Sequence, residues 1–259
     1  MKQVIVTGAY GAIGKAIAEA IAKQPDHSVF MVGRDCPRLD QAVQEVQEST
    51  GNKDVIAHAA DLSNKESIYD LAKRIEGPIY TLVNNAAACP PSRTETAAGI
   101  EVQFATNILG YVWMMEAFTQ HLKLGAPSRI VNVASYFAGE LQLDDLEFKQ
   151  RTYDNNSAYR QSKQANRMLT VAFAEQLSSL NISVNACHPG DVNSKLSNDL
   201  GFGGSTTAAQ GADTPAWLAV STEVEQISGK YFSNRKEVHC EFASDSAGID
   251  ALYERVGSF

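Results

Sequence analysis

The sequence of 259 residues has no long apolar run and no closely spaced cysteines. Its first apolar stretch, from Val4, is broken by glycines after a few residues, which is too early for a signal segment or a membrane span. We therefore expect no membrane anchor and a cytoplasmic location. The four cysteines are scattered and no histidine cluster accompanies them: Cys36, Cys89, Cys187 and Cys240. This spacing predicts neither a metal site nor a disulfide framework, so we expect reduced thiols.

The sequence is also short of positive charge. Its 22 lysines and arginines are outnumbered by 30 aspartates and glutamates, which gives a formal net charge of −8. A protein that binds nucleic acid needs a basic face for the phosphates, so nucleic acid is not an expected partner. With 44% hydrophobic residues the chain can bury a substantial core, and its length permits a single domain over residues 1–259.

Short runs rich in β-branched residues alternate with amphipathic stretches along the chain. The strand-like runs cover residues 3–7, 28–32, 54–59, 79–83, 129–134 and 182–187. Stretches such as AIGKAIAEAIAK separate them and have the apolar spacing of helices. This alternation predicts a doubly wound α/β domain, with helices on both faces of a parallel sheet. Ligands bind such sheets beyond the carboxyl ends of the strands, so residues that follow a strand are the candidates for a site.

The glycine-rich turn TGAYGAIG, residues 7–14, lies between the first strand and the first helix. Its glycines let the backbone turn tightly and approach a pyrophosphate, whose negative charge is favoured at the positive end of a helix. A tight turn without a ligand is the alternative. The position within a βαβ unit favours dinucleotide binding, as in a Rossmann domain.

The end of the second strand indicates which dinucleotide is bound. An acidic residue there accepts hydrogen bonds from a ribose 2′-hydroxyl, whereas an arginine accommodates a 2′-phosphate. Here the strand runs into Gly33, Arg34 and Asp35, and the arginine offers a forked cationic set of donors. We therefore predict NADP(H). The alternatives are an Arg34 that pairs only with Asp35 in solvent, and an Asp35 that serves the 2′-hydroxyl of NAD(H).

Two tyrosine and lysine pairs have the i, i+4 spacing that brings a phenol and an ammonium to one helix face. They are Tyr159 with Lys163, and Tyr69 with Lys73. Tyr69 lies in an amphipathic stretch whose apolar positions are expected to pack on the sheet while its charges face water. Tyr159 instead follows the fifth strand, and that strand ends near Ser135. Because a serine at the end of a strand accompanies only this pair, Tyr159 and Lys163 are the predicted catalytic residues.

These segments together match a known family. In chain order they are TGAYGAIG (7–14), ADL (60–62), NNAA (84–87), TNILG with Asn107, RIVNVAS ending at Ser135, AYRQSK (158–163) and HPGDVNS (188–194). With this set the chain resembles the short-chain dehydrogenase/reductases over nearly its whole length, and in particular the branch of retinol dehydrogenases and protochlorophyllide reductases. Two positions depart from the family pattern, because Ala12 and Ala87 each replace a glycine.

The resemblance implies a single Rossmann domain with a mainly parallel sheet of about seven strands. It also implies hydride transfer between a nicotinamide and a carbonyl or alcohol carbon. Tyr159 would be the general acid, Lys163 the cation that lowers its pKa and holds the nicotinamide ribose, and Ser135 the hydroxyl that positions the substrate oxygen. Asn107 would hold a water of the proton relay, with local hydrogen bonding in its helix as the alternative.

The resemblance further implies a set of cofactor contacts and no metal site. The expected residues are Gly8, Gly11, Ile13 and Gly14 at the pyrophosphate, Arg34 at the 2′-phosphate, Asp61 and Leu62 at the adenine, Asn85 at a ribose, and Pro189, Val192 and Ser194 beside the nicotinamide, together with Tyr159 and Lys163. His188 precedes a Pro-Gly pair and is expected to pack or form a hydrogen bond rather than to act in catalysis. Tyr136 and Phe137 are candidates for the wall of the substrate pocket or for the core.

We predict an NADP(H)-dependent oxidoreductase, of the carbonyl reductase or alcohol dehydrogenase type, that acts on a small apolar ketone or aldehyde. Reduction of a conjugated C=C bond and a scaffold that senses NADP(H) without turnover are the alternatives. The loop over residues 193–211 is the candidate substrate loop, and its part rich in glycine, serine and threonine, 201–211, has the place of a mobile lid or of an ordinary surface loop. The apolar stretch 101–122 predicts either an interface helix of a homodimer or a helix packed inside the domain.

Overall fold

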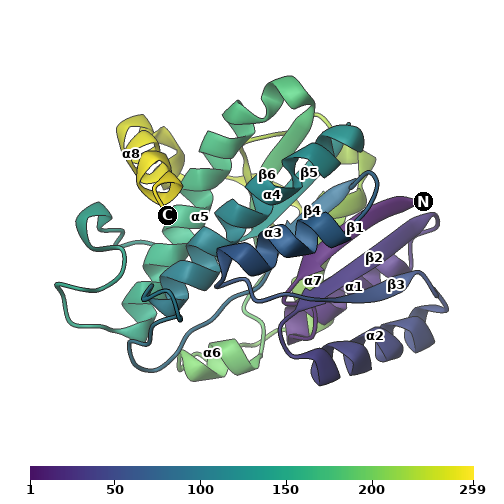
Figure 1. Ribbon diagram of the computed structural model, residues 1–259, viewed down its shortest axis with the longest axis horizontal. Coiled ribbons are helices and arrows are strands. Elements are labelled where there is room, and N and C mark those ends of the chain that lie inside the picture. Colours follow the sequence, from purple (N-terminus) through teal and green to yellow (C-terminus); the bar gives the residue numbers. More distant parts are fainter.

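The computed structural model describes residues 1–259, and its strands form one sheet (Figure 1). Their bounds are β1 (Lys2–Thr7), β2 (His27–Gly33), β3 (Val55–Ala59), β4 (Thr81–Asn84), β5 (Ser128–Val133), β6 (Ile182–His188), β7 (Tyr231–Ser233) and β8 (Lys236–Val238). The order in the sheet is β3-β2-β1-β4-β5-β6-β7-β8, and all neighbours are parallel except β7 and β8. The six strands predicted from the sequence are present, and the sheet exceeds the expected seven strands by one.

The extra strand, β8, belongs to a tight hairpin with β7. Asn234 and Arg235 join the two strands, and both have positive φ angles, 50° and 57°. Such a turn matches the twist of an antiparallel pair. Each of the two strands has only three residues, so neither is long enough to show an alternating pattern in the sequence.

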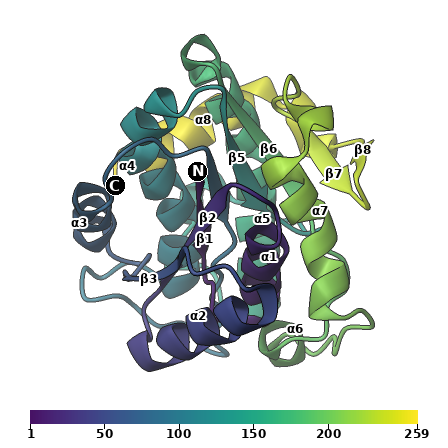
Figure 2. The same ribbon diagram turned by 90° about the vertical axis from the view of Figure 1, so that its right-hand side faces the viewer.

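Helices cover both faces of the sheet (Figure 2). Their bounds are α1 (Ala12–Ala22), α2 (Cys36–Thr50), α3 (Lys65–Arg74), α4 (Gly110–Leu124), α5 (Asn155–Gln176), α6 (Lys195–Asp199), α7 (Ala208–Val220) and α8 (Ser246–Gly257). One apolar core joins the sheet to α1, α2 and α7, and a second joins it to α3, α4, α5 and α8. The predicted doubly wound Rossmann fold is therefore confirmed. None of these helices has the length and the apolar character that a bilayer crossing requires.

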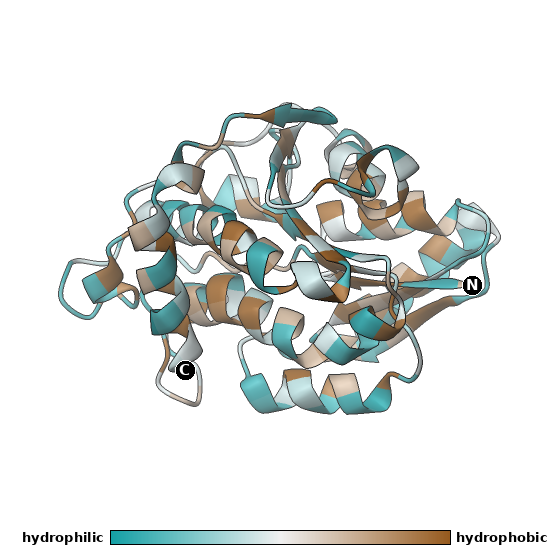
Figure 3. Ribbon diagram, turned by 90° about the horizontal axis from the view of Figure 1, so that it is seen from above, coloured by the Kyte–Doolittle hydropathy of each residue, from teal (hydrophilic) through white to brown (hydrophobic).

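Successive residues of the central strands point to opposite faces of the sheet. In β1, Val4 and Val6 join the core of α1, whereas Ile5 joins the core of α4 and α5. Figure 3 shows hydrophobic residues, in brown, on these strands, and hydrophilic ones, in teal, along the outer helices and loops. Burial on both faces explains why the strands are nearly continuous apolar runs in the sequence.

The order of the strands reverses between β1 and β4, where a crevice for a ligand opens in this kind of sheet. The Thr7 hydroxyl, at the end of β1, accepts hydrogen bonds from the backbone N–H groups of Asn85 at 2.9 Å and Ala86 at 3.1 Å. These two bonds hold the chain that leaves β4 beside the glycine-rich turn that leaves β1. Two predicted binding segments are thereby brought to one edge of the sheet.

The apolar stretch 101–122 forms a π-helix, η1 (Phe104–Leu109), that continues into α4. Only Glu116 and Gln120 of this stretch are exposed. The structure therefore agrees with the alternative in which this helix is packed inside the domain, because almost all of its apolar surface is already covered within one chain.

Helix α8 completes the core beside α5. Ile249, Leu252 and Val256 are buried in that core. The ring of Tyr253 packs edge to face on Phe173 of α5, with the ring centroids 5.4 Å apart. The C-terminal helix thus supports α5, the helix that carries the predicted catalytic tyrosine and lysine.

We predict that Leu252→Ala destabilises the protein by about 2–5 kcal/mol, because the lost side chain leaves a cavity in the core. The matched control is Leu124→Ala, since Leu124 is 72% exposed whereas Leu252 is 0% exposed. The control should change the free energy of unfolding by less than about 0.5 kcal/mol. Urea denaturation followed by circular dichroism measures both values. Equal losses for the two variants would show that α8 does not contribute to the core.

Candidate active site

The start of α1 offers unpaired backbone N–H groups. Gly8 has a φ angle of 64°, which favours glycine, and its carbonyl accepts the N–H of Gly11 at 3.0 Å. No side chain caps α1, whereas side chains cap α2, α3 and α5. Free N–H groups and the helix dipole favour an anion here, so this turn fits a pyrophosphate. Ala12, which departs from the family pattern, is exposed and begins the helix after Gly11.

The glycine-rich turn packs closely against the chain that follows β4. A Cβ atom on Gly8 would lie 2.8 Å from the Cα of Ala86, and one on Gly14 would lie 2.6 Å from Nδ2 of Asn85. Asn85 donates from this nitrogen to the carbonyl of Thr7 at 2.9 Å. These contacts require glycine at both positions. The structure places Asn85 beside the turn, and its contact with a ribose stays a prediction.

The junction of β2 and α2 is cationic. Arg34 follows β2 and is exposed, while Asp35 caps α2 by accepting the backbone N–H of Arg38 at 3.2 Å. Sequence reasoning missed Arg38 and Tyr10, although an arginine one helical turn after Arg34 was a usable signal. The Arg38 guanidinium lies 4.7 Å from the centroid of the Tyr10 ring, and this ring occupies the space that a Cβ on Gly33 would need. Two arginines and a carboxylate engaged in capping suit a phosphate better than a hydroxyl.

The three predicted catalytic side chains converge beyond the end of β5. Ser135 follows that strand, and Tyr159 and Lys163 lie on the second and third turns of α5. All three are buried, and Ser135 and Tyr159 line the same cavity. The Lys163 ammonium donates to the carbonyl of Val133 at 2.9 Å and lies 5.4 Å from the centroid of the Tyr159 ring. The three residues predicted from the sequence, Ser135, Tyr159 and Lys163, therefore lie close together in the folded protein.

Burial governs the protonation of this cluster. It raises the pKa of Tyr159 above the usual value for a phenol, while the neighbouring Ser135 hydroxyl lowers that pKa. Burial also lowers the pKa of Lys163 to about 7. At neutral pH Tyr159 therefore holds a proton that it can donate, and Lys163 is near the midpoint of its titration. A negative charge that develops nearby would favour the ammonium form of Lys163.

The second tyrosine and lysine pair lies on the surface. The Tyr69 hydroxyl donates to Glu116 at 3.3 Å, and Lys73 pairs with Asp70 at 2.9 Å. The Lys73 side chain is 75% exposed, so solvent screens its charge. The apolar positions of this stretch are buried as predicted: Ile68, Leu71, Ala72 and Ile75.

Asn107 is buried in η1 and joins segments around the catalytic cluster. Its Oδ1 accepts the N–H of Ala88 at 2.8 Å, and its Nδ2 donates to the carbonyl of Ala88 at 2.9 Å. The same Nδ2 donates to the Ser162 hydroxyl on α5 at 3.3 Å. These bonds reach beyond the helix of Asn107, while Nδ2 also donates locally to the Gln103 side chain at 3.3 Å, as the alternative expected. They make the side chain a structural link, and its part in a proton relay stays a prediction.

The other expected cofactor residues lie at the same edge of the sheet. Asp61 and Leu62 follow β3, and Asp61 accepts the N–H of Ser63 at 3.0 Å. Four more residues line the cavity beside Ser135: Ile13, Pro189, Val192 and Ser194. Ser194 also caps α6. The structure therefore brings these residues together, while their contacts with a cofactor stay predictions.

The cavity beside the cluster has a volume of about 70 Å³ and a largely apolar wall. Tyr136 and Phe137 belong to this wall and not to the core, and Tyr136 is 61% exposed. Sequence reasoning missed three further wall residues, on α6 and just after it: Leu196, Leu200 and Phe202. Phe202 packs edge to face on Phe137 with the centroids 4.7 Å apart. In the sequence, Phe202 stands out as the one large apolar residue among the glycines of 201–204, and this could have indicated its role in the wall.

The glycine-rich segment after α6 returns to the rim of this cavity. The N–H groups of Ser205 and Thr206 donate to the carbonyl of Asp191 at 2.7 and 2.9 Å. The N–H of Asn193 donates to the carbonyl of Thr206 at 3.0 Å. Both ends of the predicted substrate loop are thus tied together beside the site, and its closure as a lid stays a prediction.

His188 forms the hydrogen bond expected of it. Its Nδ1 accepts the backbone N–H of Tyr136 at 3.3 Å, and the two rings pack edge to face. Burial lowers the pKa of His188 to about 4, and the charge of Arg167 adds to this effect. The imidazole is therefore neutral at physiological pH and holds one wall residue in place.

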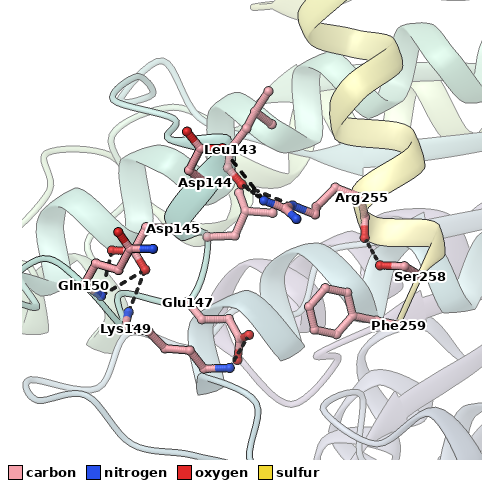
Figure 4. Close-up of a pocket in the computed structure, with 10 residues that line it drawn as sticks. Leu143, Asp144, Asp145, Glu147, Lys149, Gln150, Arg255, Ser258 and Phe259 are labelled. Atoms are coloured by element: carbon pink, nitrogen blue, oxygen red, sulfur yellow. Dashed lines mark hydrogen bonds and ion pairs between the residues drawn. The ribbon is translucent and has the colours of Figure 1, made fainter.

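A larger pocket, of about 250 Å³, lies away from the cluster, between η2 (Leu143–Asp145) and α8 (Figure 4). Its charged groups are already engaged, since Lys149 pairs with Glu147 at 2.7 Å and Arg255 donates to the carbonyl of Leu143 at 3.1 Å. None of the predicted site residues lines it. The smaller cavity is therefore the better candidate for the active site, because Ser135 and Tyr159 line it.

Comparison with known proteins agrees with this site. A family model described as short chain dehydrogenase matches residues 2–201. Retinol dehydrogenase 13 of Mus musculus is 34% identical over 258 residues, which cover 91% of this chain and 76% of that protein. Retinol dehydrogenase 11 of Homo sapiens is 32% identical, with 98% and 83% covered. A solved short chain dehydrogenase from Burkholderia cenocepacia in complex with NADP has the same fold, with a TM-score of 0.72 at 24% identity over 89% of this chain and 95% of that chain.

The fold and these matches define an oxidoreductase that uses a nicotinamide cofactor. The chain belongs to the short-chain dehydrogenase/reductase family, and within it to the retinol dehydrogenase-like branch.

We predict that Gly14→Ala weakens nicotinamide nucleotide binding by about tenfold, or about 1.4 kcal/mol. The added Cβ would lie 2.4 Å from the carbonyl oxygen of Gly8, so the turn must move. Gly257→Ala is the control, because nothing lies within 4 Å of a Cβ at that helical glycine. Fluorescence titration with NADPH and NADH measures both variants. Wild-type affinity in Gly14→Ala would contradict the assigned cradle.

Proposed function

We propose that the protein is an NADP(H)-dependent carbonyl reductase or alcohol dehydrogenase. Its substrate is a small apolar ketone or aldehyde, or the corresponding alcohol. The observation that carries this proposal is the buried cluster of Ser135, Tyr159 and Lys163 at the wall of an apolar cavity. A surface pair of the same spacing, Tyr69 with Lys73, lacks both the burial and the serine.

Each member of the cluster has a separate task in carbonyl reduction. A bound nicotinamide supplies the hydride that reaches the carbonyl carbon. The Ser135 hydroxyl donates a hydrogen bond to the substrate oxygen and orients it. The Tyr159 hydroxyl gives its proton to that oxygen as the negative charge develops, and the phenolate that remains is stabilised by the Lys163 ammonium. Oxidation of an alcohol follows the same path in reverse.

The raised pKa of Tyr159 secures the protonated state that a proton donor needs, but it also makes the phenol a weaker acid. Burial favours the neutral phenol, so the residue enters the reaction protonated. Its proton leaves most easily when the phenolate gains a nearby positive charge. Lys163 provides this charge, and its bond to the carbonyl of Val133 keeps the ammonium beside the ring.

The preference for NADP(H) is supported by the junction of β2 and α2. Arg34 is free of any ion pair and exposed, and Arg38 adds a second cation. Asp35 uses its carboxylate to cap α2 and is less available to a ribose hydroxyl. A doubly charged 2′-phosphate therefore finds two cationic donors here.

The substrate class is supported by the wall of the cavity. Aromatic and aliphatic side chains form most of it, and Phe202 and Phe137 meet across it. Such a wall stabilises apolar groups through burial of their surface. The relatives named for retinol, an apolar alcohol, favour the same class. The loop over residues 193–211, which carries Leu196, Leu200 and Phe202, is the proposed determinant of specificity.

A panel of ketones, aldehydes and conjugated enones, assayed with NADPH, tests this function. Reduction of ketones or aldehydes is the expected result. Turnover of enones at the C=C bond alone would favour the alternative reductase reaction. Binding of NADPH without turnover of any compound would favour a sensing scaffold.

We predict that Tyr159→Phe lowers kcat by about 100- to 10,000-fold, because it removes the proton donor. The binding of NADPH should be retained. Tyr69→Phe is the matched control, since it removes the same hydroxyl from the surface pair, and it should keep the wild-type rate. Steady-state kinetics and NADPH titration measure both effects. Near wild-type reduction by Tyr159→Phe would show that another group supplies the proton.

We predict that Arg34→Ala reduces the preference for NADPH over NADH by about 10- to 100-fold, because one charge-assisted contact with the 2′-phosphate is lost. The control is Arg255→Ala, since Arg255 is an exposed arginine at the pocket of Figure 4. The ratio of kcat/KM for the two cofactors is the measurement. An unchanged ratio in Arg34→Ala would overturn the proposed cofactor choice.

A homodimer stays a prediction, and the burial of helix α4 within one chain does not favour it. Its apolar residues are covered by the sheet and by neighbouring helices of the same chain. Light scattering of the purified protein distinguishes a monomer from a dimer. The cytoplasmic location also stays a prediction.

A further inference from the structure

Arg167 is a buried cation that the proposed reaction does not use. It lies on α5, one helical turn after Lys163, and is 6% exposed. Its guanidinium forms no ion pair and instead donates to a carbonyl and to a hydroxyl. A buried charge without an opposite charge is costly. The retention of this cation beside the catalytic cluster therefore points to a function.

The contacts of Arg167 end at the main chain of the catalytic serine. Its Nη2 donates to the backbone carbonyl of Ser135 and, at 2.8 Å, to the Tyr231 hydroxyl. The guanidinium carbon lies 3.9 Å from the centroid of the Tyr231 ring and 5.5 Å from that of Phe242. Two aromatic rings thus fix the plane of the guanidinium. Arg167 does not line the substrate cavity, so it acts on Ser135 through the backbone.

The segment around Ser135 needs such support because it lies beyond the sheet. The last residue of β5 is Val133, and the following N–H, of Ala134, still bonds to the carbonyl of Cys187 at 2.8 Å. Beyond that point, side chains hold the backbone. Arg167 binds the carbonyl of Ser135, and His188 accepts the N–H of Tyr136 at 3.3 Å. The Ser135 hydroxyl oxygen itself accepts the N–H of Phe137 at 3.1 Å, so its direction depends on the backbone of residues 135–137.

We propose that Arg167 is a positioning residue for Ser135. Its guanidinium fixes the backbone carbonyl and thereby aims the hydroxyl at the substrate oxygen. The position of a reacting group within a fraction of an ångström has a large effect on rate. This inference rests on the proposed function, because it assigns a cause to the placement of one of the three catalytic groups.

The chain contains a matched control in Arg129. This arginine is also buried, at 4% exposed, and also donates to a tyrosine hydroxyl and a backbone carbonyl, those of Tyr80 and Ser221, both at 2.8 Å. It lies at the start of β5, at the end of the strand away from Ser135. Arg129 also donates to the carbonyl of Leu218 at 3.2 Å and lies 4.0 Å from Glu225, so its loss removes at least as many contacts as the loss of Arg167. Only the loss of Arg167 should affect Ser135.

The test compares Arg167→Met with Arg129→Met. Both variants should lower the thermal midpoint. Arg167→Met should also lower kcat by about 10- to 100-fold, whereas Arg129→Met should keep kcat within about 3-fold of wild type. The dissociation constant of NADPH should stay within about 3-fold of wild type in both variants, because neither arginine is part of the proposed cofactor site.

Hydrogen exchange provides a readout that needs no turnover. Mass spectrometry of a peptide that covers residues 134–137 should show faster exchange in Arg167→Met than in wild type and in Arg129→Met. If Arg167→Met does not fold, Arg167→Lys retains a charged donor for the Ser135 carbonyl. That variant should fold and show an intermediate kcat and intermediate exchange.

Different results would refute the proposed function and the proposed role of Arg167. If the wild-type protein reduces no carbonyl compound, the proposed function fails, while the exchange data still decide whether Arg167 orders the serine segment. If the wild-type protein is active and Arg167→Met matches Arg129→Met in kcat and in exchange, the role of Arg167 is overturned. If Arg167→Lys folds with wild-type exchange and an unchanged kcat, any cation suffices and the geometry of the guanidinium is not required.

Discussion

The hydrogen bond from the Lys163 ammonium to the carbonyl of Val133 is the contact on which the site depends. It joins α5 to the end of β5 and holds the amino group of a residue that is only 2% exposed. A buried ammonium needs a fixed acceptor, because water is not available to solvate it. Tyr159 lies one turn earlier on α5 and lines the same cavity as Ser135. The same burial lowers the pKa of Lys163 to about 7 and raises that of Tyr159.

Other parts of the core keep α5 in this position. Asn132 of β5 donates to the Thr170 hydroxyl on α5 at 2.9 Å and accepts from Asn84 of β4 at 3.0 Å. This buried polar chain fixes the register of the helix along the sheet more specifically than apolar contacts alone. On the outer side, α8 covers α5 with apolar side chains. Both faces of α5, which carries the predicted catalytic residues, are therefore restrained.

The two halves of the site depend on the reversal of strand order. Strands β1 and β4 are neighbours in the sheet, although 73 residues lie between Thr7, the last residue of β1, and Thr81, the first residue of β4. The Thr7 hydroxyl binds the chain after β4, so the phosphate cradle and the segment with Asn85 form one surface. The end of β5 lies next to β4 and brings Ser135 to the same edge. Family membership is shown by the match to the family model and to the retinol dehydrogenases, whereas the substrate is proposed to depend on the few side chains of the cavity wall.

The sequence by itself determined the main elements of the fold and singled out the residues predicted to be catalytic. Periodicity located the six main strands, because burial on both faces leaves continuous apolar runs. It also placed Tyr159, Lys163 and Ser135 after a strand, where ligands bind such sheets. It did not show the hairpin of β7 and β8, because three-residue strands are too short to have a visible period.

Only the tertiary structure decided which side chains meet. Arg38 and Tyr10 stack, Phe202 reaches Phe137, and Arg167 binds the carbonyl of Ser135. Contacts of this kind join residues from different elements, and their geometry follows from packing and not from spacing along the chain. The sequence context already favoured Tyr159 and Lys163 over Tyr69 and Lys73, and the structure adds the contrast in burial between the two pairs, which is a property of the folded molecule.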